Sequence, residues 1–409
     1  MSEIIKEKYK DTKLGLIPAH WEIKTLGDIG KTINGLTYSP NDIHKDGVLV
    51  FRSSNVQNRQ IELEDNVFVS VDKDNYNPVK ENDLLICVRN GSRSLIGKNA
   101  LIKKEHEGLA FGAFMSIFRS EDNSYLYQLF DTDIYNREIH RNLGATINSI
   151  NGGNLKKFKF PFPPKKERDR ITQILSQWDE AIETSQNLIE KLKLRKKGLM
   201  QELLSGKKRL DGFDEEWNEE PLGKFIRYTP RPKEKPKNHY LALGLRSHGK
   251  GIFHKNNFDP DSIAMDTLYE VRENDLVVNI TFAWEHAIAI ANSKDEGGLV
   301  SHRFPTYTFV KNQSDPIFFR YYVLQKRFKY LLNVISPGGA GRNRVMSKKD
   351  FPKLLVKVPQ FNEQVAISNV LSSVDNEIEI MLERLKTQKT QKKGLMQQLL
   401  TGQKRVKID

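Results

Sequence analysis

The sequence has a single cysteine, Cys87, among its 409 residues and lacks any long apolar run. One cysteine excludes an intramolecular disulfide and a cysteine-ligated metal cluster. A membrane-spanning helix needs about 18 consecutive apolar residues, and the first ten residues, MSEIIKEKYK, lack the apolar centre of a signal peptide. These absences predict a cytoplasmic protein.

Acidic residues are also scarce relative to basic ones, with 52 Asp and Glu against 65 Lys and Arg, which gives a net charge of +13. Excess positive charge favours a polyanionic partner such as nucleic acid, although many soluble proteins are as basic. The 38% hydrophobic and 29% charged residues are typical of a soluble globular chain, long enough for two or three domains.

Catalytic motifs are missing as well. The stretch FPFPP at 160–164 has no acid or amide before its prolines, so the Asn/Asp-Pro-Pro-aromatic signature of adenine methyltransferases is absent. There is no Walker lysine motif and no His-Glu-x-x-His, and Pro260-Asp261 has no Glu-x-Lys strand at nuclease spacing. Because the nine histidines are scattered without metal-ligand spacing, we expect no catalytic residue and no metal site.

One basic phrase occurs twice, as KKGLMQELLSGKKRL at 196–210 and as KKGLMQQLLTGQKRV at 392–406. The same offset of 196 residues relates PPKKERDRITQILSQWDEAIE at 163–183 to PQFNEQVAISNVLSSVDNEIE at 359–379. Between these anchors the similarity is weaker and the offset drifts, as expected for loops of different length. The chain is therefore predicted to contain two copies of one fold.

Each copy ends in a segment with the periodicity of a long helix, from about 165 to 204 in the first copy. Gly206 and Gly402 follow the last turn, where a C-terminal cap is expected. We expect two such stripes to bury each other in an antiparallel coiled coil, unless each stripe packs on its own neighbouring domain. The residues expected to pair the helices are Ile171, Leu175, Trp178, Ile182, Ile189, Leu199, Leu203, Ile367, Leu371, Val374, Ile378, Leu385, Leu395 and Leu399.

The stretches between the helices contain short apolar runs punctuated by Asn-Gly, Gly-Gly and Pro, with helical patches among them. They predict mixed α/β domains, and the whole chain is predicted to be α+β with an internal pseudo-two-fold repeat. The predicted boundaries are a first domain at 1–160, a first long helix at 161–206, a second domain at 207–357, and a second long helix with a basic tail at 358–409.

This plan resembles the specificity subunit of type I restriction-modification enzymes, over essentially the whole chain. The resemblance rests on Trp-x4-Leu-Gly at Trp21 and Trp217, on the Pro-x3-Glu-x3-Ile-x3-Leu-x3-Asp-x2-Ile helix start, and on the KKGLMQ-x-LL-(S/T)-G helix end. Glu363-Gln364 matches the Glu-Gln frequent in the family, whereas the first copy has Glu167-Arg168. We expect this departure to be tolerated at a surface position.

The resemblance implies a non-catalytic subunit that binds double-stranded DNA. Each domain would be a target recognition domain for one half of a bipartite site, and the helices would separate the halves and bind two adenine methyltransferase subunits. S-adenosylmethionine, ATP and magnesium would belong to these methyltransferase subunits and to separate restriction and translocase subunits. Two other hypotheses remain, a scaffold that binds something other than DNA and a cryptic nuclease or methyltransferase.

Base edges are read by Arg, Lys, Asn, Gln, Ser and Thr, and phosphates mostly by Lys and Arg. Because the loops of the two copies differ, the two half-sites are expected to differ in sequence. A solvated surface is the alternative for any single candidate. The candidate DNA-binding residues are Arg52, Ser53, Arg89, Asn90, Ser92, Arg93, Asn148, Asn151, Arg246, Ser247, His248, Trp284, His286, His302, Arg303, Arg342, Asn343 and Arg344.

Overall fold

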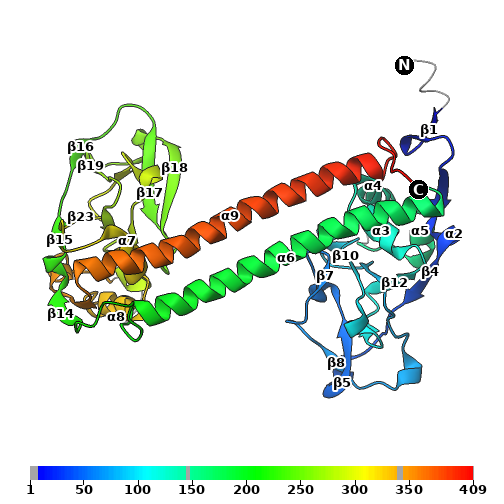
Figure 1. The fold of residues 1–409 in the computed structure, drawn as a ribbon, viewed down its shortest axis with the longest axis horizontal. Helices are drawn as coiled ribbons and strands as arrows, with labels where there is room; N and C mark the ends of the chain where they lie inside the picture. Colours follow the sequence, from blue (N-terminus) through cyan, green and yellow to red (C-terminus); the bar gives the residue numbers. More distant parts are fainter. Residues whose placement is uncertain (1–7, 144–147, 339–343, 409) are drawn as a thin grey trace. The chain divides into compact units, whose positions relative to one another are not determined.

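The computed structural model describes residues 8–143, 148–338 and 344–408. It divides into two compact units, Met1–Gln186 with Arg384–Asp409, and Asn187–Glu383. The two long helices are α6 (Lys165–Leu203) and α9 (Phe361–Leu399) (Figure 1). Each unit therefore combines one domain with parts of both helices.

The first unit is built on a four-stranded antiparallel sheet in the order β10-β9-β12-β4 and a three-stranded sheet in the order β11-β5-β8. Its central strand β9 carries the apolar run LLIC, and all four residues are buried, as is typical of a strand covered on both faces. The strands are β1 (Tyr9–Thr12), β2 (Gly15–Pro18), β3 (Glu22–Thr25), β4 (Lys31–Asn34), β5 (Ile43–Phe51), β6 (Val56–Gln57), β7 (Gln60–Ile61), β8 (Phe68–Val69), β9 (Leu84–Cys87), β10 (Asn99–Leu101), β11 (Ala110–Phe111), β12 (Met115–Arg119) and β13 (Lys159–Phe162). The short helices are α2 (Leu26–Ile29), α3 (Asn123–Leu129), α4 (Asp133–Asn142) and α5 (Gly152–Lys156).

The second unit repeats the plan with a four-stranded sheet in the order β15-β23-β20-β21 and a five-stranded sheet in the order β16-β19-β22-β17-β18. The pair β17–β22 is parallel, as is its counterpart β5–β11 in the first unit. The strands are β14 (Asn218–Pro221), β15 (Ile226–Tyr228), β16 (Pro232–Glu234), β17 (Tyr240–Leu245), β18 (Ile252–Phe258), β19 (Thr267–Glu270), β20 (Leu276–Val278), β21 (Ile288–Ile290), β22 (Leu299–Val300), β23 (Thr306–Phe309) and β24 (Leu355–Val358). The short helices are α7 (Pro316–Tyr322) and α8 (Lys326–Val334).

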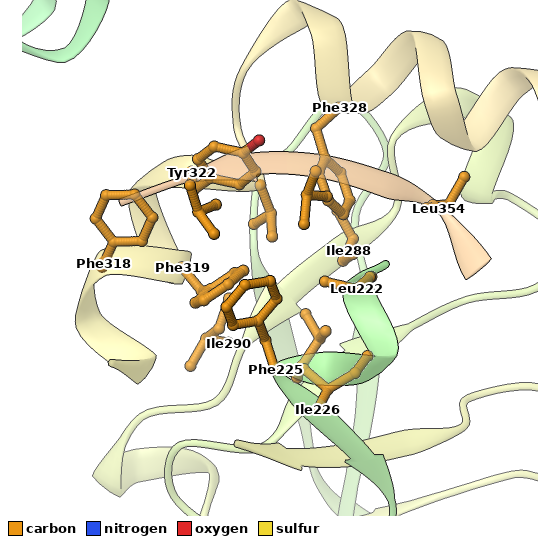
Figure 2. Packing of buried hydrophobic residues seen from close by; sticks show 14 of the residues in the cluster. Leu222, Phe225, Ile226, Ile288, Ile290, Phe318, Phe319, Tyr322, Phe328 and Leu354 are labelled. Atoms are coloured by element: carbon orange, nitrogen blue, oxygen red, sulfur yellow. The ribbon is translucent and has the colours of Figure 1, made fainter. Parts of the chain in front are cut away.

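The main core of each unit includes the helix stripes. In the second unit, Phe319 and Phe328 pack with strand residues such as Ile288 (Figure 2), and Leu203 of α6 and Ile367 and Leu371 of α9 belong to the same cluster. In the first unit, the corresponding cluster takes in Ile171 and Leu175 of α6 and Leu399 of α9, with Leu395 packed against it. The sequence predicts that the apolar stripe of each helix packs on the other helix or on its neighbouring domain. Both contacts occur, because the ends of each stripe pack on a domain and on the other helix.

The remaining predicted pairing residues are buried to different degrees. Ile189 and Val374 are buried, at 3% and 2% exposure, and Leu199 is half-buried beside the core of the second unit. Along the middle of the helices, the side chains of Trp178, Ile182, Ile378 and Leu385 are half-buried. The apolar stripe is therefore buried where it joins a domain core and also at Ile189 and Val374, which belong to neither core cluster.

Polar contacts between α6 and α9 establish that the helices run antiparallel within each unit, and in the second unit the direction follows from Arg195 with Glu377 together with Lys196 with Asp375. In the first unit, Lys392 Nζ lies 2.6 Å from Asp179 Oδ1, and Ser185 Oγ bonds Gln388 Oε1 at 2.9 Å, so ascending positions in α6 meet descending positions in α9. In the second unit, Lys196 Nζ lies 2.5 Å from Asp375 Oδ1. Lys196 and Lys392 are the first residues of the two KKGLMQ phrases, which explains why that lysine recurs.

The same aspartates also hold a domain against the helix pair. Gln128 of α3 donates to Asp179 Oδ2 at 2.7 Å, and the Tyr321 hydroxyl of α7 donates to Asp375 Oδ2 at 2.7 Å. Each carboxylate therefore joins three elements, namely both helices and one domain. A buried or half-buried charge with so many partners favours one register over its neighbours.

A second repeated contact joins the start of each domain to a helix N-terminus. Trp21 Nε1 donates to Glu167 at 3.0 Å, and Arg405 clamps both oxygens of this carboxylate at 2.6 and 2.8 Å. The residues Trp217, Glu363 and Arg209 make the same contacts in the second unit, at 3.1, 2.6 and 2.7 Å. We call each of these Trp-Glu-Arg groups a latch.

The glycines after the long helices have the predicted cap geometry. Gly206 and Gly402 have φ of +70° and +73°, and their amides bond the carbonyls of Leu203 and Leu399. A Cβ on Gly402 would lie 2.4 Å from the Pro18 ring. Glycine is therefore required there by both backbone conformation and space.

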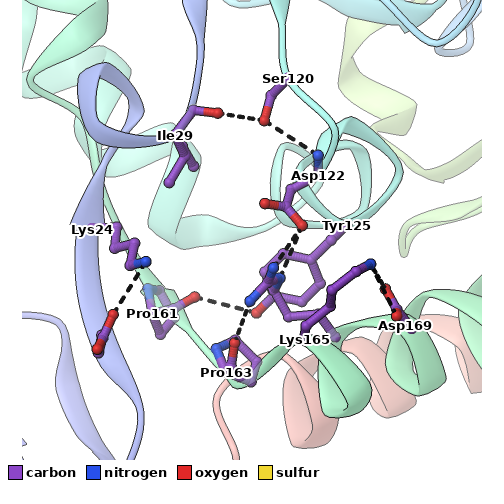
Figure 3. Close-up of polar contacts among 11 residues, drawn as sticks. Lys24, Ile29, Ser120, Asp122, Tyr125, Pro161, Pro163, Lys165 and Asp169 are labelled. Carbon is purple, nitrogen blue, oxygen red and sulfur yellow. Dashed lines mark hydrogen bonds and ion pairs between the residues drawn. The ribbon is translucent and has the colours of Figure 1, made fainter.

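The expectation that Arg168 occupies a surface position is wrong. Its side chain is only 11% exposed, and its guanidinium bonds Asp122 at 2.8 and 3.0 Å, in the group of polar contacts at the start of α6 (Figure 3). Gln364, its counterpart, is fully buried and accepts from the Asp315 amide at 2.9 Å. Different side chains thus anchor the two copies at the same place.

Candidate nucleic-acid interface

In the first domain, the loop after β9 gathers polar side chains that the sequence singles out. Asn90 donates to Ser53 Oγ at 2.9 Å and accepts from the Ser92 amide at 2.9 Å. Asn148 donates to the Gly91 carbonyl at 3.0 Å, and the Asn148 carbonyl accepts from the Asn90 amide at 3.3 Å. These bonds fix the amide groups in place, as hydrogen-bonding readers of base edges require.

Cationic side chains surround this loop. Arg89 and Arg93 are exposed, and the Arg89 guanidinium lies 5.7 Å from the centre of the Phe114 ring. Lys98 Nζ bonds the Ser53 carbonyl at 3.3 Å. The loop therefore combines neutral hydrogen-bonding groups with positive charge, the composition expected of a surface that binds phosphates and bases.

Two predicted residues of the first domain are engaged in the fold. Arg52 forms an ion pair with Asp65 at 2.8 Å, which neutralises its charge. Asn151 accepts the Asn154 amide at 2.7 Å and so caps α5. Both residues hold neighbouring loops in place.

In the second domain, the loop after β17 meets the turn at Ala283–Glu285. Ser247 donates to a Glu285 carboxylate oxygen at 2.5 Å, and the His248 amide donates to the Glu285 carbonyl at 2.7 Å. The exposed Arg246 lies with its guanidinium 5.6 Å from the Phe253 ring centre. The structure thus brings Arg246, Ser247 and His248 together with the turn that carries Trp284.

A cation and an aromatic ring also meet in this domain. The Arg344 guanidinium lies 5.3 Å from the Trp284 ring centre and is held by the carbonyls of Ser336 and Asn333 at 3.1 and 3.2 Å. His302 and Arg303 are exposed in the turn before β23. The predicted residues Arg342 and Asn343 lie outside the described residues.

His286 is withdrawn from any surface. It is 5% exposed, and its Nε2–H donates to the Val323 carbonyl at 2.6 Å. Burial lowers the pKa of this imidazole, so the ring is held neutral. His286 therefore stabilises the interior of the domain and is not available to contact DNA.

Two residues of these surfaces are not among the candidates predicted from the sequence. Glu285 accepts a hydrogen bond from the Ser247 hydroxyl and so fixes that side chain. Phe114 directly precedes a strand, and its side chain is 56% exposed. Neither sequence position carries a signal that separates it from a structural residue.

The described residues contain no group of three or more His, Cys, Asp and Glu side chains that could hold a metal ion. Burial raises the pKa of the Cys87 thiol to about 11, which keeps it protonated. Among the helices of the described part of the chain, none has the length and apolar character needed to cross a bilayer.

Most of the chain is similar to known specificity domains and subunits. Residues 18–194 and 224–388 match the type I restriction modification DNA specificity domain. The chain is 26% identical over 435 aligned positions to the putative type I restriction enzyme MjaX specificity subunit of Methanocaldococcus jannaschii, with 98% of each chain covered. The S subunit structure from M. genitalium has a TM-score of 0.55 at 16% identity, with 93% of this chain and 96% of that chain covered. A structure from work on complex assembly of the type I R-M system has a TM-score of 0.53 at 14% identity, with 94% and 99% covered.

Proposed function

Because the chain belongs to the type I restriction-modification specificity subunit family and has two target recognition domains, we propose that it is the non-catalytic subunit that directs a DNA methyltransferase and a restriction enzyme to one DNA sequence. Each domain reads one half of a bipartite, asymmetric site. The paired helices set the separation of the halves and dock two methyltransferase subunits. The subunit acts on double-stranded DNA in the cytoplasm.

The observation that carries this proposal is a contrast between the two copies. The latches and the Asp-Lys pairs repeat residue for residue at an offset of 196, whereas the polar loop clusters have different composition. Contacts that repeat in both copies suit one kind of partner subunit that binds both copies. Loops that differ suit two half-sites of different DNA sequence. The net charge of +13 is compatible with DNA as the partner, and salt-dependent binding to a duplex would distinguish this function from a scaffold for unrelated ligands.

The chemistry is assigned to other subunits. S-adenosylmethionine belongs on the methyltransferase, and ATP and magnesium on the restriction and translocase subunits. The specificity subunit contributes affinity and register, in which Arg89, Arg93 and Arg303 contact phosphates or guanines and the amide cluster around Asn90 reads base edges.

The test is to express the chain together with an adenine methyltransferase subunit of its own system and to map methylated adenines in the host genome by single-molecule sequencing. We expect one bipartite, asymmetric motif that disappears when this chain is omitted. Unchanged methylation without the chain would refute the proposal. Methylation by the chain alone would refute its non-catalytic character.

A further inference from the structure

Phe114 is an exposed aromatic residue beside the polar loop that follows β9 in the first domain. It lies in the tight turn that leads into β12, where the Met115 amide bonds the Gly112 carbonyl at 2.8 Å. Single exposed apolar side chains are common and need no explanation by themselves. The surroundings of this ring distinguish it.

The backbone fixes Phe114 directly beside the polar loop. Its carbonyl accepts from two consecutive amides, those of Val88 at 3.0 Å and Arg89 at 3.1 Å. Asn90, which bonds Ser53, follows immediately. The ring therefore shares a rigid support with the side chains proposed to read bases, and the Arg89 guanidinium lies over it.

The corresponding turn of the second domain presents a different side chain. The Ile280 amide donates to the Arg303 carbonyl at 3.0 Å, the same bond that Val88 makes with Phe114. Arg303 is exposed and is already a candidate for DNA contact. One position of the fold thus presents a phenyl ring in the first domain and a guanidinium in the second.

Apolar side chains read DNA through the C5 methyl group of thymine, which adenine, guanine and cytosine lack. A guanidinium at the same place is suited to guanine or phosphate instead. We propose that Phe114 packs against a thymine methyl group in the half-site read by the first domain and so determines that base. This inference rests on the proposed DNA-binding function.

The test uses the complex of the chain with its methyltransferase and duplexes that contain the mapped site. Each thymine of both half-sites is replaced in turn by deoxyuridine, which lacks only the methyl group, and dissociation constants are measured. For the unaltered complex we expect about fourfold weaker binding at a single thymine. Phe114→Ala is expected to bind the thymine duplex about fourfold more weakly and to lose the discrimination at that position.

Ile43→Ala is the matched control, because Ile43 is 50% exposed in β5 of the same domain and should leave the thymine preference unchanged. The inference is overturned if Phe114→Ala keeps the full preference for thymine, or if no thymine methyl matters to the unaltered complex. Equal weakening on thymine and deoxyuridine duplexes would assign the ring to a protein contact. Failure of the unaltered complex to bind its site at all would instead refute the proposed function.

Discussion

The two copies agree where each domain joins the helices and differ where loops carry polar side chains. Trp21, Glu167 and Arg405 have exact counterparts in the second unit, with matching contacts. The first domain gathers amides and hydroxyls around Asn90, whereas the second combines a Trp-Arg stack with a Ser-Glu bond. Contacts that support the fold limit variation, whereas the loops outside these contacts can differ between the two copies.

The start of the long helices shows how far this constraint extends. Arg168 bonds the Asp122 side chain, whereas Gln364 bonds the Asp315 backbone. Both fasten the first turn of a long helix to the segment that precedes α3 or α7. The place of the contact is common to the two copies, but its chemistry is not.

Removing the latch carboxylates should have the largest effect on stability. Glu167→Ala and Glu363→Ala each leave a Trp Nε1–H and an arginine without their partner, and the two carboxylates are 1% and 3% exposed. We expect each to lower the free energy of unfolding by about 3 kcal/mol, measured by chemical denaturation. Glu180→Ala, on an exposed position of α6, should change it little. A much smaller loss in one copy would show that the two latches are not equivalent.

Removing the ion pairs between the helices should have the second-largest effect on stability. The size of the loss should differ between the two copies. The Lys392 side chain is 8% exposed, whereas Lys196 is 26% exposed. Lys392→Met should therefore cost about 2 kcal/mol and Lys196→Met about 1 kcal/mol in the same measurement. The neighbouring lysines are exposed, so Lys393→Met and Lys197→Met are controls with no expected loss. Equal effects at paired and neighbouring lysines would contradict a role in register.

The two long helices and the internal repeat could be predicted from the sequence. Apolar spacing of three or four residues with a glycine at its end predicts a long helix, and the structure has helices at Lys165–Leu203 and Phe361–Leu399. The repeat likewise predicts two copies of one fold. These features are local or periodic, which is why sequence patterns report them.

The partners of individual polar residues could not be predicted in this way. Asn151 and Arg52 are drawn into a helix cap and an ion pair by residues that loop folding brings close. His286 is polar in sequence, but its side chain is 5% exposed and bonds the Val323 carbonyl, 37 residues later in the chain. Burial of Arg168 depends on Asp122, 46 residues earlier, and no periodic pattern reveals such a pair.

Exposed arginines of the two candidate interfaces should affect DNA binding and leave stability unchanged. Arg93→Ala and Arg303→Ala each remove one positive charge, so each should weaken binding several-fold and reduce the slope of log affinity against log salt by about 0.9 if the residue contacts a phosphate. The measurement is binding of the cognate duplex over a range of salt concentrations. Arg137→Ala, an exposed position of α4, is the control. An unchanged slope with lost base preference would assign the residue to a base instead.

The smallest expected effect concerns pH and the buried histidine of the second unit. Because burial lowers the pKa of His286 in the folded state, the unfolded chain takes up a proton first as the pH falls below about 6.5. The free energy of unfolding should therefore decrease between about pH 7 and pH 5. His286→Gln should flatten part of this dependence, and any loss that is equal at every pH reflects packing or the positive φ. His106 is also buried with a lowered pKa, so His106→Gln should flatten a separate part. If neither substitution changes the slope, carboxylates and not these imidazoles govern the acid sensitivity of the fold.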